Sequence, residues 1–131
     1  MSSAPAGVVL GFAPIDALHE EWGQTLACLT HAQGTAATAA ALRSLLAHLE
    51  RHFGAEEAWM LESGFGAAAC HAREHAQVIA VVAEVMRRFD AGDSELAARL
   101  VAELPRWFEI HASTMDAALA AHLKLAARPL S

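Results

Sequence analysis

Histidines and carboxylates recur in this chain at intervals of four residues, inside segments that are otherwise largely apolar. The pairs His52/Glu56 and His71/His75 are the clearest cases. Residues four apart lie on one face of an α-helix, about one turn from each other, so each pair points in one direction only if its segment is helical. This spacing predicts several helices that turn polar side chains toward a shared interior.

Four segments have the apolar periodicity of amphipathic helices, and together they predict an all-α fold. An Ala-rich composition without tyrosine also favours helix. The connections are short, which favours antiparallel neighbours, so we expect an up-down-up-down four-helix bundle. The expected helices span about 17–32, 36–62, 67–90 and 94–124, with Asp16 as the first N-cap and Asp93 or Ser94 as the last.

The last expected helix has two notable features. Pro105 should kink or break it, because proline lacks the N–H that an inner turn requires. Its buried stripe is expected to run at nearly heptad spacing. The stripe comprises Leu96, Leu100, Leu104, Trp107, His111, Met115, Ala118 and His122.

A chain of 131 residues is long enough for one domain with a real core. We expect a flexible leader over 1–14, a single domain over 15–124 and a C-terminal tail over 125–131.

The net charge of -6 argues against nucleic acid and anionic membranes as partners. No apolar run approaches the ~20 residues that span a bilayer. No basic segment marks a signal peptide, so a cytoplasmic location is expected. Cys28 and Cys70 are interpreted as reduced, buried thiols, with a disulfide between them left open.

Each expected helix contributes to one set of potential metal ligands. Five neutral imidazoles and two carboxylates suit a pair of divalent transition ions, iron above all. A carboxylate can bridge two cations through its two oxygens, whereas a neutral imidazole offers one lone pair. With one further bridging oxygen, such a set fills all but one position of two octahedra, which leaves a place for a small ligand. The set is His19, His52, Glu56, His71, His75, His111 and Asp116.

One spacing in this set does not fit a regular helix. His111 and Asp116 are five residues apart, which places them about 140° apart around an ideal α-helix. They share a face only where the helix is locally wider. The spacing therefore predicts a π-bulge, a feature that occurs at functional sites.

Four motifs carry a resemblance to a known family. They are Ile15-Asp16-x-x-His19-x-Glu21, His52-Phe53-x-x-Glu56-Glu57-x-x-Met60, His71-x-x-x-His75 and Trp107-Phe108-x-x-His111-x-x-x-x-Asp116. Together they resemble the ligand pattern of the hemerythrin family, specifically its single-domain bacteriohemerythrins, over about residues 12–123.

The resemblance implies a role for each ligand. His71, His75 and His111 would hold one iron, and His19 and His52 would hold the other. Glu56 and Asp116 would bridge the two ions beside an oxygen bridge. Dioxygen would bind reversibly at the two-histidine iron, for oxygen storage, delivery or sensing. We expect no fused signalling domain, so a sensing role would require a separate protein partner.

One residue departs from the family pattern. Members often have leucine after the tryptophan that precedes the last histidine, where this chain has Phe108. We expect Phe108, with Trp107, to line the ligand pocket and to change access to it, because an aromatic ring covers more area than leucine.

Three further histidines and one glutamate are interpreted as lying outside the ligand set. His48 lies four residues before His52 and could replace it if the site slid by one turn, although the surrounding motif selects His52. His31 and His122 lie too far along their helices from the nearest ligands, and we interpret them as partly exposed or capping groups. Glu57 points about 100° away from Glu56 and is interpreted as a solvated charge.

Two other functions compete with oxygen binding. A di-iron enzyme that reduces peroxide or nitric oxide is the main alternative, but it needs a proton source and a route for electrons. A structural bundle with zinc is the second, although zinc usually takes four ligands and seven is too many. No Glu has a histidine three residues later, which argues against the carboxylate-rich di-iron oxidases.

Overall fold

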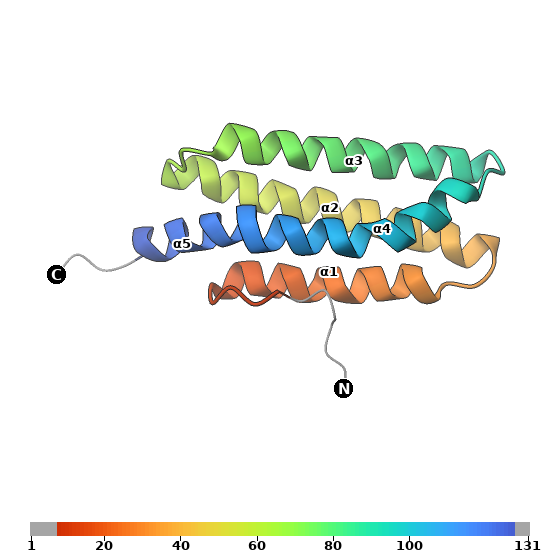
Figure 1. Cartoon of the computed structure of the whole chain (residues 1–131), viewed down its shortest axis with the longest axis horizontal. Helices are drawn as coiled ribbons and strands as arrows, with labels where there is room; N and C mark the ends of the chain where they lie inside the picture. The colour runs from red at the N-terminus through yellow and green to blue at the C-terminus, as the bar shows by residue number, and fades with distance from the viewer. Residues whose placement is uncertain (1–7, 128–131) are drawn as a thin grey trace.

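The computed structural model describes residues 8–127 and shows an antiparallel helical bundle (Figure 1). The elements are α1 (Ala13–His31), α2 (Thr35–Ser63), α3 (Ala68–Asp90), α4 (Glu95–His111), the π-helix η1 (Ala112–Asp116) and α5 (Ala117–Ala126). Helix α1 packs on α2, α2 on α3, α3 on α4, and α4 on α1, which closes the ring. The expected up-down-up-down four-helix bundle is confirmed, and α4, η1 and α5 together form its fourth rod.

The start of α1 differs from the expectation. The helix begins at Ala13, so Asp16 lies in its first turn and is not its N-cap. The Asp16 carboxylate instead accepts hydrogen bonds from the backbone N–H groups of Leu10 and Gly11, at 2.7 and 3.1 Å. Asp16 therefore holds the segment that precedes the helix. Residues 1–7 of the expected leader and 128–131 of the expected tail lie outside the described residues, and the division at 15–124 remains a prediction.

Helix α2 ends at Ser63, one residue after the expected end at about 62, and Gly64 is its C-cap. This glycine has a φ of +70°, a left-handed conformation that glycine adopts without steric cost. Its N–H donates to the Leu61 carbonyl, and the Phe65 N–H donates to the Met60 carbonyl. His122 Nε2–H donates to the Ser63 carbonyl at 3.0 Å, so the expected capping role of His122 is confirmed and α5 is tied to the end of α2.

The predicted π-bulge between His111 and Asp116 is confirmed as η1. The Ala117 N–H donates to the Ala112 carbonyl, five residues back, which is the hydrogen bond of a π-helix. The hydroxyls of Ser113 and Thr114 donate to the carbonyls of Glu109 and Ile110, at 2.7 and 2.6 Å. These side chains supply hydrogen bonds to carbonyls whose usual partners have shifted by one residue.

The wider turn also moves the buried face by one residue. Before η1, Leu100, Leu104 and His111 of the expected stripe are buried and Leu96 and Trp107 are partly buried. From the last residue of η1 onward, the buried side chains are Asp116, Leu119, Ala120 and Leu123. Ala118 is exposed, and Met115 and His122 are only partly buried. The expectation for Ala118 is therefore wrong, because an extra residue in one turn rotates everything that follows.

Helix α4 continues through Pro105 without a break in its assignment. Figure 1 shows its first turns inclined to the rest of the rod. Pro105 itself is exposed, so its missing N–H and its ring lie on the solvent side, where distortion is tolerated.

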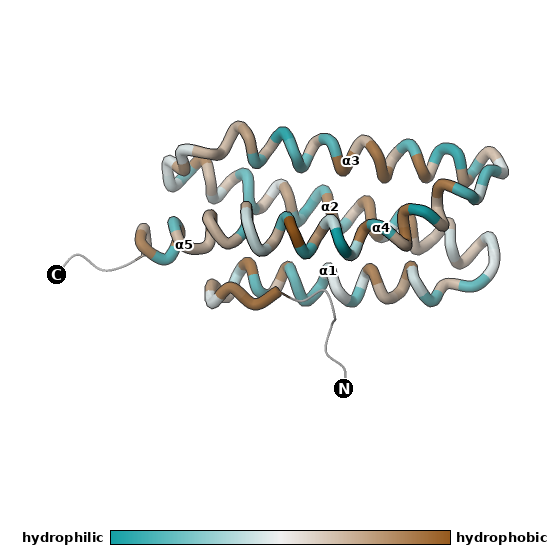
Figure 2. The backbone as a smooth tube through the Cα atoms, in the orientation of Figure 1, coloured by the Kyte–Doolittle hydropathy of each residue, from teal (hydrophilic) through white to brown (hydrophobic). Residues whose placement is uncertain are grey.

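The apolar core is divided into two clusters along the bundle axis, and the helices alternate in hydropathy along their length (Figure 2). The larger cluster includes Trp22, Leu45, Leu49, Phe53 and Phe108, and lies toward the α1–α2 connection. The smaller one, at the other end, comprises Ile15, Met60, Leu119, Ala120 and Leu123. The polar residues of the four rods therefore form a layer between the two apolar clusters.

The two cysteines contradict the expectation of burial. Both Cys28 and Cys70 are exposed, and both are free thiols. Each occupies a helix position that faces outward, which residue type alone did not indicate. They take no part in either core cluster.

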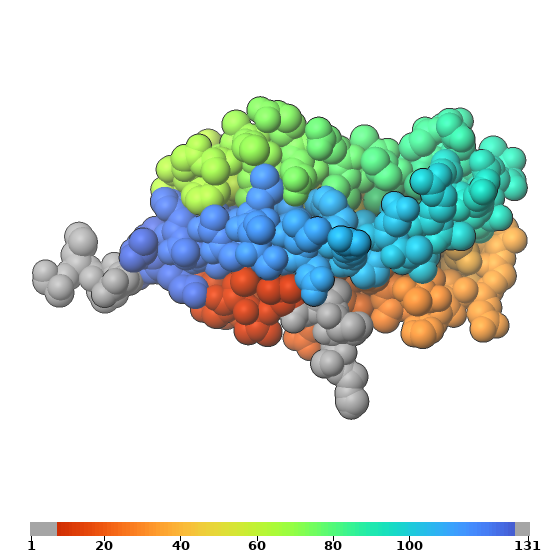
Figure 3. All heavy atoms as spheres, viewed as in Figure 1, coloured from red at the N-terminus to blue at the C-terminus, as the bar shows by residue number. Residues whose placement is uncertain are grey.

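On the face shown in Figure 3, side chains of α4 and α5 fill the space between α1 and α3. Within residues 8–127, no helix is both long and apolar enough to cross a bilayer.

The core division predicts a sharp contrast between two leucines of α2. Leu49 is fully buried and Leu61 is 83% exposed. We expect Leu49→Ala to lower the free energy of unfolding by about 2–5 kcal/mol, since it leaves a cavity in the larger cluster. Leu61→Ala, the matched control, should stay within about 0.5 kcal/mol of the parent. Urea unfolding followed by circular dichroism measures both, and equal effects would contradict the assigned core.

Candidate metal centre

The structure brings all seven predicted ligand residues into the polar layer between the two apolar clusters. Each side chain is at most 1% exposed. They form two overlapping groups, and within each group the ligand atoms lie within 4.8 Å of one another. One group is Glu56, His71, His75, His111 and Asp116, and the other is His19, His52, Glu56 and Asp116.

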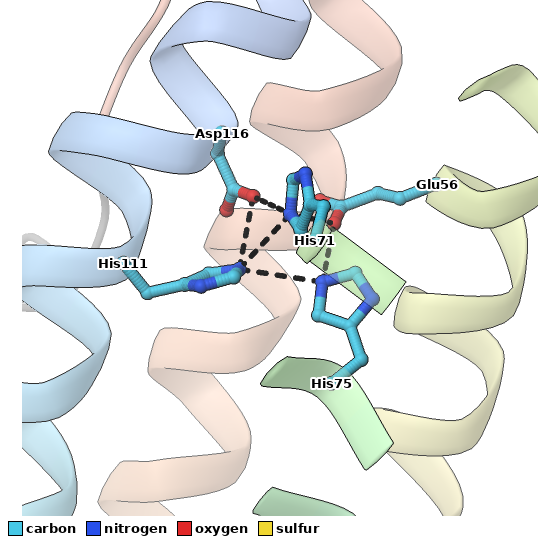
Figure 4. Close-up of side chains that lie close together, drawn as sticks. All are labelled: Glu56, His71, His75, His111 and Asp116. Carbon is cyan, nitrogen blue, oxygen red and sulfur yellow. Dashed lines mark hydrogen bonds and ion pairs between the residues drawn. The ribbon is translucent and has the colours of Figure 1, made fainter. Parts of the chain in front are cut away.

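The first group is built on three histidines from α3 and α4 (Figure 4). His71 and His75 face inward from one side of α3, as their spacing predicted. His111 Nε2 lies 3.2 Å from His71 Nε2 and 3.3 Å from His75 Nε2. Three ring nitrogens thus converge on one small volume.

The second group has two histidines, His19 from α1 and His52 from α2. Their ring centroids are 5.6 Å apart. His52 Nε2 lies 3.0 Å from Glu56 Oε2, and His19 Nε2 lies 2.9 Å from Asp116 Oδ2. Both rings therefore direct Nε2 toward the same two carboxylates that the first group contacts.

The two carboxylates divide their oxygens between the groups. Glu56 places Oε1 3.2 Å from His75 Nε2 and Oε2 beside His52. Asp116 places Oδ1 3.0 and 3.1 Å from Nε2 of His71 and His111, and Oδ2 beside His19. One oxygen toward each group is the arrangement of a carboxylate that bridges two cations. Asp116 reaches this position because η1 turns it to the face of His111.

Most ligand rings are also held from outside by their second nitrogen. His75 Nδ1–H donates to Glu57 Oε2 at 3.0 Å, and His111 Nδ1–H donates to Glu74 Oε1. His19 Nδ1–H donates to the Val8 carbonyl at 2.8 Å. A carboxylate or carbonyl at Nδ1 places the proton there and leaves the Nε2 lone pair free, as in the outer shell of metal-binding histidines.

These tautomers make the residues fit a cation. With Nδ1 protonated in both His75 and His111, their Nε2 atoms face each other at 3.3 Å as two lone pairs. Two acceptors at that distance repel unless a positive charge lies between or beside them. Nitrogen and oxygen donors in this combination suit iron and similar transition ions.

The buried groups of the site shift one another's pKa values in different directions, and Asp116 raises those of His19 and His111. Burial opposes ionisation of Asp116, but the rings of His111 and His19 beside its oxygens outweigh it and hold the pKa of this carboxyl below its usual range. Burial raises the pKa of Glu56, because its charge is removed from water. Burial lowers the pKa of His52 to about 3, so the ring is neutral near pH 7, as a metal ligand must be.

Sequence reasoning missed the outer partners of the site. Glu57 was interpreted as a solvated charge; its side chain is partly exposed, but it also hydrogen-bonds His75, a contact that the sequence analysis did not foresee. Glu74 was given no role, although it contacts His111 from α3. Glu57 fell within one of the family motifs, and that position was the available signal.

The remaining histidines lie outside both groups. His31 is exposed, as expected. His48 does not replace His52, which is the histidine that belongs to a group. It is nevertheless buried, and its Nε2 lies 3.0 Å from His52 Nδ1.

The two expected pocket residues lie beside different groups. Phe108 is buried, and its ring contacts His19 edge to face, with centroids 5.0 Å apart. The ring of Trp22 stacks on that of Phe108, with centroids 4.8 Å apart. Trp107 stacks on His111, at 4.7 Å, and so belongs with the three-histidine group. Phe108 is thus the residue of the pair placed at the two-histidine group.

Comparison with known proteins gives a consistent result. The family model described as "Hemerythrin HHE cation binding domain" matches residues 12–123. The chain is 42% identical to a bacteriohemerythrin of Ralstonia nicotianae over 107 residues, which cover 82% of this chain and 77% of that protein. It is 28% identical to a bacteriohemerythrin of Methylococcus capsulatus over 57% of each chain. No solved structure matches significantly. With its four-helix bundle and its buried histidine–carboxylate layer, this chain belongs to the hemerythrin family.

Proposed function

We propose that this protein holds two iron ions and binds dioxygen reversibly, for oxygen storage, delivery or sensing. The observation that carries the proposal is the division of carboxylate oxygens, since Glu56 and Asp116 each present one oxygen to each histidine group. Two separate single-ion sites would not need this sharing. Family membership and the names of the bacteriohemerythrin relatives support iron and oxygen as the metal and ligand.

The proposal assigns His71, His75 and His111 to one ion, and His19 and His52 to the other. Glu56 and Asp116 would bridge both. A pair of iron(II) ions would supply the electrons for reversible binding of dioxygen, which the side chains alone do not supply. The ion with two histidines has fewer protein donors, so the open position for a small ligand belongs there.

The surroundings of the two-histidine half favour a small apolar ligand. Phe108 and Trp22 form an aromatic stack against His19, and both are buried. Water and anions enter such a pocket at a high cost, because they lose hydration without gaining partners. Exclusion of water and anions protects a reduced site from irreversible oxidation. The aromatic stack therefore supports reversible binding of dioxygen over an enzymatic reaction.

A peroxide- or nitric oxide-reducing enzyme remains the alternative function. It would require electrons to reach the site in every cycle. The two thiols that could serve as redox groups, Cys28 and Cys70, are exposed and belong to neither ligand group. Reversible binding needs no such supply and is the function we favour.

The shared carboxylate generates the first prediction for this site. Glu56→Gln should lower the iron content from two ions per chain toward none, because an amide has one acceptor oxygen and no charge and cannot bridge. The melting temperature should fall as well, since metal bound only by the folded state stabilises it. Glu50→Gln, an exposed change on the same helix, is the matched control and should keep both irons. Elemental analysis giving one iron per chain in the parent protein, or mainly zinc, would contradict the di-iron assignment.

A second prediction concerns reversibility. The protein reduced under nitrogen should gain a visible absorption band on exposure to air, and the band should disappear when oxygen is removed. Repeated cycles with little loss of amplitude would support a carrier or sensor. A band that never returns to baseline without added reductant, or rapid decay with peroxide as substrate, would support the enzyme instead.

A third prediction concerns Phe108. Phe108→Ala should open the wall beside His19, so the oxygenated protein should oxidise irreversibly at a higher rate and bind azide more tightly. Phe108→Leu should have a smaller effect, because leucine still fills part of the space. Phe89→Ala, a change near the far end of α3, is the control for a lost aromatic ring.

The rates are measured by the decay of the visible band in air, with iron content determined for each variant. If Phe108→Ala keeps its iron and oxidises no faster than the parent, the ring does not guard the ligand position.

A further inference from the structure

The outer contact of His52 differs from those of the other ligand histidines. His75 and His111 donate directly to carboxylates, and His19 donates to a backbone carbonyl. His52 Nδ1 instead meets another buried imidazole, His48 Nε2, at 3.0 Å. An imidazole can either donate or accept at each nitrogen, so this contact alone does not fix the tautomer of His52.

The contact continues from His48 to the protein surface. His48 Nδ1 lies 3.2 Å from Glu21 Oε1, an electrostatic contact rather than a well-aligned hydrogen bond. Arg51 donates to the second oxygen of Glu21 at 2.8 Å. The side chains are 2% exposed at His48, 45% at Glu21 and 59% at Arg51. A continuous polar path therefore leads from solvent, between α1 and α2, to a ligand of the two-histidine half.

Glu21 selects one of the two proton arrangements along this path. If His52 Nδ1 carries a proton and donates to His48 Nε2, then His48 carries its own proton on Nδ1, which faces the Glu21 carboxylate favourably. If His48 instead donates to His52, its unprotonated Nδ1 faces Glu21, and two acceptors meet at 3.2 Å. The carboxylate disfavours the second arrangement, in which the Nε2 lone pair of His52 would also be lost.

We propose that His48, held by Glu21, is a positioning residue that keeps His52 in the tautomer and orientation that present its Nε2 lone pair to the two-histidine half of the metal site. The inference rests on the proposed di-metal function, because it assigns an outer partner to one of its ligands. Loss of such outer partners typically weakens metal binding by about 10- to 100-fold.

This arrangement also makes the two halves of the site unequal. The three-histidine half receives two carboxylates directly at its rings, Glu57 and Glu74. In the two-histidine half a neutral ring stands between Glu21 and the ligand, so less negative charge reaches the ion. The half proposed to bind dioxygen is thus the one whose metal affinity depends on a single interposed side chain.

The main test compares two substitutions of His48. His48→Leu fills the space but leaves the His52 Nδ1–H without an acceptor. His48→Gln keeps an amide oxygen that can accept this hydrogen bond, and it should rescue the loss. His31→Leu, which changes an exposed histidine, is the matched control. Each variant is loaded with iron(II) under nitrogen and is then challenged with an iron(II) chelator.

We expect one of the two iron ions to leave His48→Leu about 10- to 100-fold more readily, while the second leaves at the rate of the parent. His48→Gln and His31→Leu should release both ions like the parent. Release of both ions together, release unchanged in His48→Leu, or failure of His48→Gln to restore retention would each overturn the proposal.

A second variant keeps the test decisive if His48→Leu does not fold. Glu21→Gln removes the charge that selects the tautomer and alters a partly exposed side chain, with the exposed neighbour Glu20→Gln as its control. In the proton NMR spectrum of the iron(II) protein, one exchangeable imidazole N–H resonance should shift or exchange faster in Glu21→Gln. The other resonances should keep their positions. An unchanged spectrum would contradict the selection of the tautomer by Glu21.

These readouts use iron(II) in the absence of oxygen, so they do not depend on whether dioxygen binds reversibly. Failure of the oxygenation cycles with selective iron loss in His48→Leu would overturn the carrier function and leave the positioning role intact. Reversible oxygenation cycles together with unchanged iron retention in His48→Leu would overturn the positioning role alone.

Discussion

The burial of two carboxylates at the centre of a small bundle is the constraint on which the rest of this structure depends. Glu56 and Asp116 are fully buried, and an unpaired buried charge is too costly for a small domain to tolerate. Inward-facing imidazoles surround them on each helix, and neutral rings cannot by themselves balance two negative charges. The proposed pair of cations would satisfy both the oxygens and the facing nitrogen lone pairs. The apolar clusters at either end keep water from doing so instead.

One irregular turn connects the fold to the site. The π-turn η1 brings Asp116 to the face of His111 and, in the same rotation, brings Leu119 and Leu123 into the smaller core cluster. A regular helix would satisfy its own hydrogen bonds better but would direct Asp116 away from the centre. The distortion is compensated locally by the hydroxyls of Ser113 and Thr114, so the geometry of the site and the packing of α5 are set by the same residues.

Groups around the site contact the second ring nitrogen of four of the five ligand histidines, His19, His52, His75 and His111. Glu57 and Glu74 act directly on the three-histidine half, whereas Glu21 acts through His48 on the other. These carboxylates remain partly solvated, so they hold ligand rings without the full cost of burying a charge. The bundle thereby gives its two halves different electrostatic surroundings, although the inner ligands differ by only one histidine.

The sequence by itself determined the helical bundle, the seven inward-facing groups and the π-turn, because each depends on spacing along a single helix, such as the five residues from His111 to Asp116. It did not determine contacts that join different helices. Glu57 looked like a surface charge, Glu74 was given no role, His48 looked like a rival ligand, and the cysteines looked buried. Residue type and local period say little about what a neighbouring helix presents. Only the packing of α1 against α2, of α2 against α3 and of α3 against α4 decided which polar groups hold the ligand rings in place.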